Sequence, residues 1–151
     1  MFSCGFFGAK YKRDGFDFRN GILVLPDTCE VFESALVDWK EDDYEASWQI
    51  ALDTVTGPKA NHAAIITGFT GLREAAFLNW WPMYRLEATI VLQEQLLLLE
   101  PIRNQISLQN LFHFVPPRFS ENNEQAPSEW TFSIAELSQF RHCLRVARDL
   151  N

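Results

Sequence analysis

The sequence predicts an α+β fold, with a long helix after the first strands and a second helix at the C-terminal end. Short apolar or alternating segments, typical of strands, occur on both sides of one strongly amphipathic helical segment. A second helical pattern begins after Ser133. The chain has 151 residues, enough for one hydrophobic core, so we expect a single domain over residues 1–151.

The first predicted strand is the apolar run of residues 21–25. Pro26 and Asp27 follow it directly and indicate a turn. Residues 29–37 alternate in part between apolar and acidic side chains. This partial alternation predicts a second strand.

An amphipathic helix is predicted over residues 42–56. Its apolar side chains form one helical stripe of Tyr44, Trp48, Ala51, Leu52 and Val55. Acidic residues occupy the first turn, where the helix dipole favours negative charge. Gly57 can adopt the left-handed conformation that ends many helices, and Pro58 cannot continue the helix.

A strand, a loop and an aromatic strand are predicted next. Residues 62–69 are almost entirely apolar and predict a buried strand, and residues 70–74 predict a hairpin loop. Residues 75–84 predict an aromatic strand. Pro82 lies inside it and indicates an edge or a bulge, because proline cannot donate a ladder hydrogen bond.

Residues 85–93 alternate with the period of a half-buried strand. The apolar side chains expected on its inner face are Leu86, Ala88, Ile90 and Leu92. The pattern leaves open whether residues 96–99 continue this strand or form a partner strand.

The C-terminal third predicts a short helix, a loop and a final helix. Residues 107–114 are the short helix, with Ser107 as its cap, and residues 116–128 are the loop. Structure resumes at residues 130–132, and residues 133–136 have the form of a capping box. The apolar side of the final helix comprises Ile134, Leu137, Phe140, Leu144 and Ala147.

The composition excludes several classes of protein. The net charge of −7 argues against nucleic acid as a direct partner, because phosphate binding requires lysine and arginine. No apolar stretch is long enough for a membrane span, and the N-terminus lacks the pattern of a signal peptide. Cys4, Cys29 and Cys143 are odd in number and widely spaced, so we expect reduced thiols in the cytoplasm.

The negative charge is concentrated in one segment. Nine acidic residues and one basic residue lie between Asp27 and Asp53, which gives the segment a charge of −8 and the remainder +1. A solvated face with helix-capping acids is the simpler interpretation, and a partner-binding surface is the alternative. The predicted partner-binding residues are Asp27, Glu30, Glu33, Asp38, Glu41, Asp42 and Asp43. Phe32, Trp39 and Tyr44 are candidate anchors if they are exposed.

No catalytic residue, metal site or cofactor is predicted. His62, His113 and His142 lie on separate elements without metal-ligand spacing, and no phosphate-binding glycine loop occurs. Cys29 has no local signature of a nucleophile, so a buried structural cysteine is expected. A basic face at Arg141, Arg145 and Arg148 is expected to be solvated at a helix end.

Several motifs resemble one family. The string from Asp43 to Trp48, followed by Ala51 and Leu52, is similar to the start of the first long helix of certain CdiI immunity proteins. These proteins belong to bacterial contact-dependent growth inhibition systems, and the group concerned is the Enterobacter cloacae type. The other matching motifs are Met1-Phe2, the strand start at residues 62–65, and Ser128-Glu129-Trp130. Their common order and spacing carry the resemblance over most of the chain.

The resemblance implies an α+β domain with antiparallel sheets, likened to the Whirly fold. It also implies a cytoplasmic immunity protein, not an enzyme, that binds and neutralises the C-terminal toxin domain of a cognate CdiA effector. In the Enterobacter relative the toxin is a ribonuclease that attacks 16S ribosomal RNA, so a nuclease toxin is expected. An acidic surface agrees with this role, because it steers association with a basic partner.

Two other functions remain as alternatives. A Whirly-like module that binds single-stranded nucleic acid would need a basic groove, built for example from residues 10–13 and the C-terminal arginines. A small enzyme would need a polar pocket with perturbed pKa values.

Overall fold

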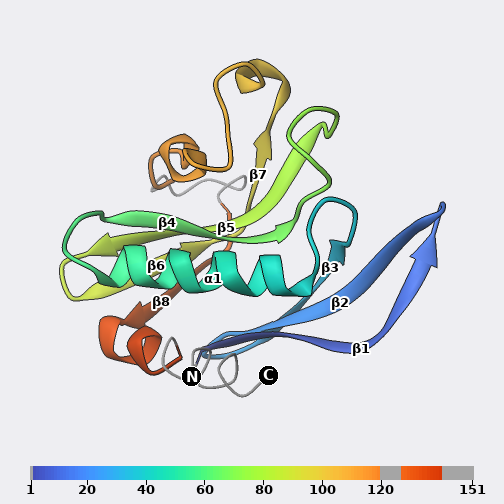
Figure 1. Cartoon of the computed structure of the whole chain (residues 1–151). Helices are drawn as coiled ribbons and strands as arrows, with labels where there is room; N and C mark the ends of the chain where they lie inside the picture. The colour runs from blue at the N-terminus through green and yellow to red at the C-terminus, as the bar shows by residue number, and fades with distance from the viewer. Residues whose placement is uncertain (1, 120–126, 141–151) are drawn as a thin grey trace.

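Two antiparallel sheets and one long helix make up most of the structure, a computed structural model that describes residues 2–119 and 127–140 (Figure 1). The strands are β1 (Ser3–Arg13), β2 (Phe16–Val24), β3 (Cys29–Ala35), β4 (His62–Gly68), β5 (Phe77–Leu86), β6 (Thr89–Gln93), β7 (Gln95–Leu98) and β8 (Glu129–Ser133). The helical elements are α1 (Glu41–Thr56), the short 3₁₀ turns η1 (Glu100–Ile102) and η2 (Leu111–Phe114), and residues 134–140. The predicted α+β class is confirmed.

The N-terminal sheet has the strand order β1-β2-β3. Its first hairpin turns at Asp14 and Gly15, which both have positive φ, and it projects away from the rest of the molecule (Figure 1). The sequence predicted only the last residues of β2 and missed β1. The part of this hairpin near its turn, residues 7–10 and 12–16, is exposed, so it lacks the apolar alternation of a half-buried strand.

Helix α1 confirms the predicted stripe, because Tyr44, Trp48 and their three partners on that face are fully buried. The Trp48 indole Nε1 donates a hydrogen bond to the Ile66 carbonyl oxygen at 2.8 Å, which ties α1 to β4. The predicted left-handed Gly57 is wrong, since its φ of −86° and ψ of 171° are extended. Pro58 explains this, because the residue before a proline is forced toward extended conformations.

The C-terminal sheet has the order β4-β5-β6-β8, with β7 also paired to β5. The buried strand predicted at residues 62–69 is confirmed by β4. The predicted boundary between residues 84 and 85 is wrong, because β5 continues to Leu86. The chain reverses at Glu87, whose φ of 57° is unusual for a residue that is not glycine, so no turn signal marked it.

Strands β6 and β7 both pair with β5, one after the other and in the same register. Residues 96–99 therefore largely continue the line of β6 and do not form a partner strand for it. The pairs Met83↔Leu92 and Trp80↔Gln95 keep the same register, so Pro82 lies beside the short break between β6 and β7. Proline has no N–H for the ladder, which accounts for a break at this point. Of the two alternatives predicted for Pro82, an edge or a bulge, the edge is wrong, because β5 is a central strand.

The half-buried character predicted for residues 85–93 is also wrong. Ile90, Val91, Leu92 and Gln93 are all buried, so both faces of β6 are covered, whereas Leu86 is exposed. Strands that are covered on both faces lack the alternation of apolar and polar residues from which a half-buried strand is predicted.

The C-terminal segments agree in part with the prediction. Residues 134–140 are helical, and Ser133 Oγ accepts a hydrogen bond from the Glu136 backbone N–H at 3.1 Å, which confirms the capping box. Leu137 and Phe140 are buried, whereas the expected positions Leu144 and Ala147 lie outside the described residues. Residues 107–114 form only the turn η2, and the Ser107 backbone N–H donates to the Asn110 side chain, so Ser107 is not a side-chain cap.

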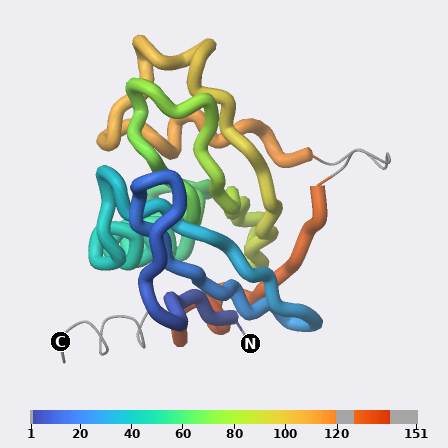
Figure 2. The backbone as a smooth tube through the Cα atoms, turned by 90° about the vertical axis from the view of Figure 1, so that its right-hand side faces the viewer, coloured from blue at the N-terminus to red at the C-terminus, as the bar shows by residue number. Residues whose placement is uncertain are grey.

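The core lies between the two sheets and α1. The side view shows the N-terminal hairpins crossing below the strands of the C-terminal sheet (Figure 2). Phe2 packs edge-on against Phe132 and Phe140, each with a centroid separation of 5.0 Å, so β1 is joined to the last described elements. None of the helices in residues 2–119 and 127–140 is long and apolar enough to cross a membrane.

Candidate partner-binding surface

The seven predicted acidic residues follow one continuous path from the β2–β3 turn to the start of α1. Asp27 lies in that turn, Glu30 and Glu33 lie on β3, and Asp38 lies in the loop after β3. The remaining three residues form the first turn of α1. These acidic residues are therefore close together along the chain. They differ in whether other residues of the protein pair with their carboxylates.

Glu33 is engaged by β1. Arg13 Nη1 donates to Glu33 Oε2 at 3.0 Å, and the Tyr11 hydroxyl donates to the same carboxylate. Burial alone would raise the pKa of Glu33, but these hydrogen bonds outweigh it, and the pKa lies below its usual value. This carboxylate is already neutralised within the chain.

Two acidic residues at the start of α1 are also engaged. Glu41 lies 3.4 Å from Lys10 Nζ and 3.4 Å from Arg19 Nη1. Asp43 accepts a hydrogen bond from the Lys40 backbone N–H at 2.9 Å, so it caps the helix as the simpler interpretation predicted.

The other four acids, Asp27, Glu30, Asp38 and Asp42, form no ion pair with any residue in the described part of the chain. Three of them are exposed and Glu30 is partly buried. The acidic surface available to a partner is thus smaller than the sequence predicted, since β1 supplies cations to its middle.

The three aromatic residues predicted as possible anchors also differ in exposure. Tyr44 is fully buried, where its hydroxyl donates to the Ala35 carbonyl at 2.8 Å and accepts from the Phe69 N–H at 3.0 Å, so it is no anchor. Burial also raises its pKa far above the usual value. Phe32 and Trp39 are partly buried against the core.

A groove of about 530 Å³ adjoins the acidic segment between β3 and the paired strands β5 and β7. Glu94, between β6 and β7, lines it together with Glu30. Burial raises the pKa of Glu94, and the nearby charge of Glu30 raises it further. Glu94 was not predicted as a site residue, because it is 64 positions from Glu30 and no local pattern links the two.

A second groove, of about 550 Å³, lies between α1 and η2. It is mainly apolar, with exposed Ile50 and Leu108, and it contains both His62 and His113. His142 lies outside the described residues. Within residues 2–119 and 127–140, no group of three His, Cys, Asp or Glu side chains is arranged to hold a metal ion.

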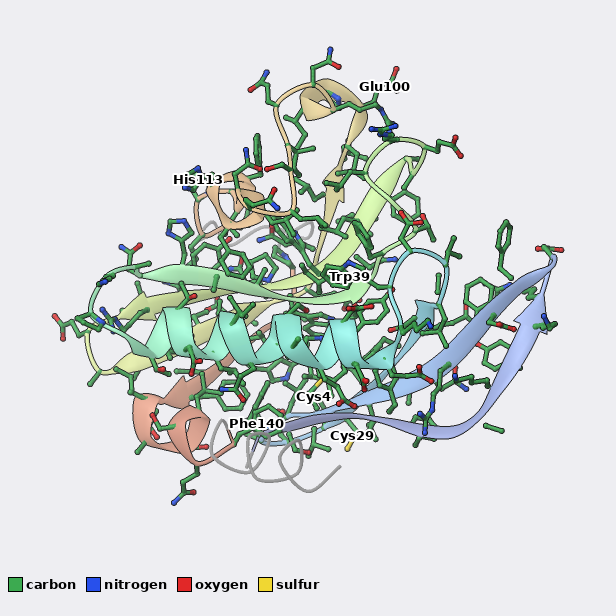
Figure 3. The ribbon with its side chains drawn as sticks, viewed as in Figure 1. Cys4, Cys29, Trp39, Glu100, His113 and Phe140 are labelled. Atoms are coloured by element: carbon green, nitrogen blue, oxygen red, sulfur yellow. The ribbon has the colours of Figure 1, made fainter. Side chains whose placement is uncertain are left out.

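The cysteine prediction needs one correction. Cys29 is exposed, not buried, because it begins β3 at the outer edge of the N-terminal sheet, whereas Cys4 is buried. Cys29 and His113 lie on opposite sides of the molecule (Figure 3), and the only hydrogen bond that His62 makes to a described side chain is with Asn61. The described residues therefore contain no cysteine–histidine pair. Cys143 and the arginines at 141, 145 and 148 lie outside the described residues.

Comparisons with known proteins agree on one relationship. Residues 34–140 match the family model described as the CdiI N-terminal domain. The fold is similar to a chain of the CdiA-CT/CdiI toxin and immunity complex from Enterobacter cloacae, with a TM-score of 0.85 and 23% sequence identity. That alignment covers 96% of this chain and 99% of the other. A search of curated protein sequences found no significant match.

Proposed function

Because the chain belongs to the CdiI family, we propose that it is an immunity protein that binds and neutralises the C-terminal toxin domain of a cognate CdiA effector. The match over residues 34–140, which spans α1 to the final helix, is the single observation that carries this proposal. The similarity in fold to a chain of a toxin and immunity complex supports it.

The proposed mode of action is binding without catalysis, in the cytoplasm of the producing cell. The partner is the toxin domain, not nucleic acid or a membrane. An inhibitor of this kind needs a complementary surface and no reactive group. The absence of a histidine–cysteine pair and of a metal-binding group among the described residues is compatible with this mode.

We place the toxin-facing surface on the acidic segment. Asp27, Glu30, Asp38 and Asp42 are its available members, while Glu33, Glu41 and Asp43 hold β1 and α1 in position. Unpaired carboxylates on one surface attract a basic partner and can raise the association rate by roughly 10 to 10³-fold. Enzymes that cleave nucleic acids need basic surfaces, so a nuclease is the toxin class that this surface fits best.

The nucleic-acid alternative has weaker support. Lys10, Arg13 and Arg19 on the projecting hairpin are paired with Glu33 or Glu41. Their charge is therefore partly neutralised, and a phosphate backbone would have to displace those carboxylates.

Protection of living cells tests the proposal directly. A strain that makes the cognate toxin domain should grow when this protein is also made and should stop growing without it. The purified pair should form a stable complex, and the complex should lack the toxin's activity on RNA or DNA. Growth arrest despite a folded, abundant protein would refute the proposed function.

Charge reversal tests the acidic surface separately. In the variant D27K/D38K we expect slower association with the toxin domain and a weaker dependence of the rate on salt. The matched control is E87K/E100K, which changes the same charge at two exposed positions, one in the β5–β6 turn and one at the start of η1 (Glu100 is labelled in Figure 3). Equal association rates for the two variants would show that Asp27 and Asp38 do not belong to the interface.

A further inference from the structure

The groove between β3 and the β5–β7 pair has two unlike walls. Glu30, Val31 and Phe32 of β3 form one wall. Trp81, Glu94 and Leu96 are part of the other. The groove opens where the N-terminal sheet separates from the C-terminal sheet, so it joins residues that are far apart in sequence.

Two carboxylates in this groove form no ion pair among the residues that the structure describes. Glu33 also lines it, but Arg13 pairs with that side chain. Neither Glu30 nor Glu94 forms an ion pair with any residue that the structure describes. Each lies close enough to the other for the charge of Glu30 to raise the pKa of Glu94. A positive charge placed between them would relieve this repulsion.

Exposed apolar side chains border the same carboxylates. Val31 is 62% exposed and Leu96 is 60% exposed, which are among the highest values for large apolar residues in the described chain. β3 is the outermost strand of its sheet, and β7 pairs only with β5. Apolar contact area, unpaired charges and free strand edges thus occur together at one concave surface, and a free strand edge is a recurrent docking site for another chain.

We propose that this groove receives a lysine or arginine side chain of the toxin domain, which lies between Glu30 and Glu94 while neighbouring toxin residues cover Val31 and Leu96. This inference rests on the proposed function. A metal ion is a poorer occupant, because the two carboxylates lack a third ligand of the kind that metal sites need among the described residues. A side chain brings its own apolar stem and fits the mixed lining better.

The neutral double variant E30Q/E94Q tests the groove without large changes in size. Its affinity for the purified cognate toxin domain should fall at least about 30-fold, mainly through faster dissociation, because a desolvated charge pair acts on the off-rate. The control E87Q/E100Q removes the same charge from two exposed positions outside the groove and should bind like the wild type. Circular dichroism and a melting curve of each variant check that folding is unchanged.

Hydrogen–deuterium exchange gives an independent readout on the wild-type protein. Adding the toxin domain should slow exchange in Cys29–Phe32 and in β7. If E30Q/E94Q dissociates as slowly as the control, or if protection falls only on other segments, the groove assignment is wrong while the proposed function stands. If the wild-type protein neither binds nor protects against the toxin, the proposed function itself fails.

Discussion

Truncation of Trp48 is the most informative test of the packing between α1 and the sheets. The side chain is fully buried, and its ring centroid lies 5.2 Å from that of Phe6 and 6.0 Å from that of Phe32. Replacement by alanine leaves a cavity among elements from both sheets, so we expect a loss of about 3–5 kcal/mol in the free energy of unfolding. At about 2–4 °C per kcal/mol for a chain of this size, the melting temperature should fall by roughly 6–20 °C.

A second substitution separates the cavity from the hydrogen bond. Trp48→Phe keeps an aromatic ring but leaves the Ile66 carbonyl without the 2.8 Å bond from the indole N–H, so we expect a smaller loss of about 1–3 kcal/mol. Ile50→Ala is the matched control on the same helix, because Ile50 is 59% exposed and its truncation should change stability by at most about 0.5 kcal/mol. Urea denaturation followed by fluorescence measures all three variants. A loss below 1 kcal/mol for Trp48→Ala would refute the proposed packing.

Three further predictions concern a helix cap, thiol reactivity and pH. Ser133→Ala should lower the free energy of unfolding by about 1 kcal/mol, visible as a lower urea midpoint, because a backbone N–H of the first turn loses its acceptor. Cys29 should be alkylated in the native protein, whereas Cys4, whose thiol pKa is raised by burial, should react only after unfolding; peptide mapping distinguishes them. The hydrogen bonds from Arg118 lower the pKa of Glu129, so this carboxylate stabilises the fold above its ordinary pKa, and the contribution disappears as pH falls through the lowered value. Glu129→Gln should therefore be less stable than the wild type in urea melts at neutral pH but equally stable at acid pH.

Burial explains the parts of the fold that the sequence predicted. One buried face gave α1 a stripe with helical period, and burial on both faces gave β4 a continuous apolar run. β1 was not predicted because most of its own residues are exposed to solvent. The end of β5 was misplaced because the turn at Glu87 uses no glycine or proline.

The acidic segment was visible in the sequence, but the ion pairs within it were not. Local composition identified the acidic segment, yet it could not reveal that Arg13 and Lys10 return from β1 to pair with Glu33 and Glu41. The same limit explains why Glu94 was missed. Electrostatic surfaces depend on which strands become neighbours, and this information is spread over the whole chain.

The contact of Phe2 with Phe132 and Phe140 has a consequence for synthesis on the ribosome. Phe2 leaves the exit tunnel before Phe132 and Phe140, so it cannot reach its final position until β8 and the start of the helix after it have been made. Until then β1 lacks part of its packing, and the growing chain exposes an aromatic side chain that the finished protein buries. Ribosome-bound chains that end before residue 129 should therefore be cleaved readily near Phe2 by added protease, whereas the released protein should resist cleavage there.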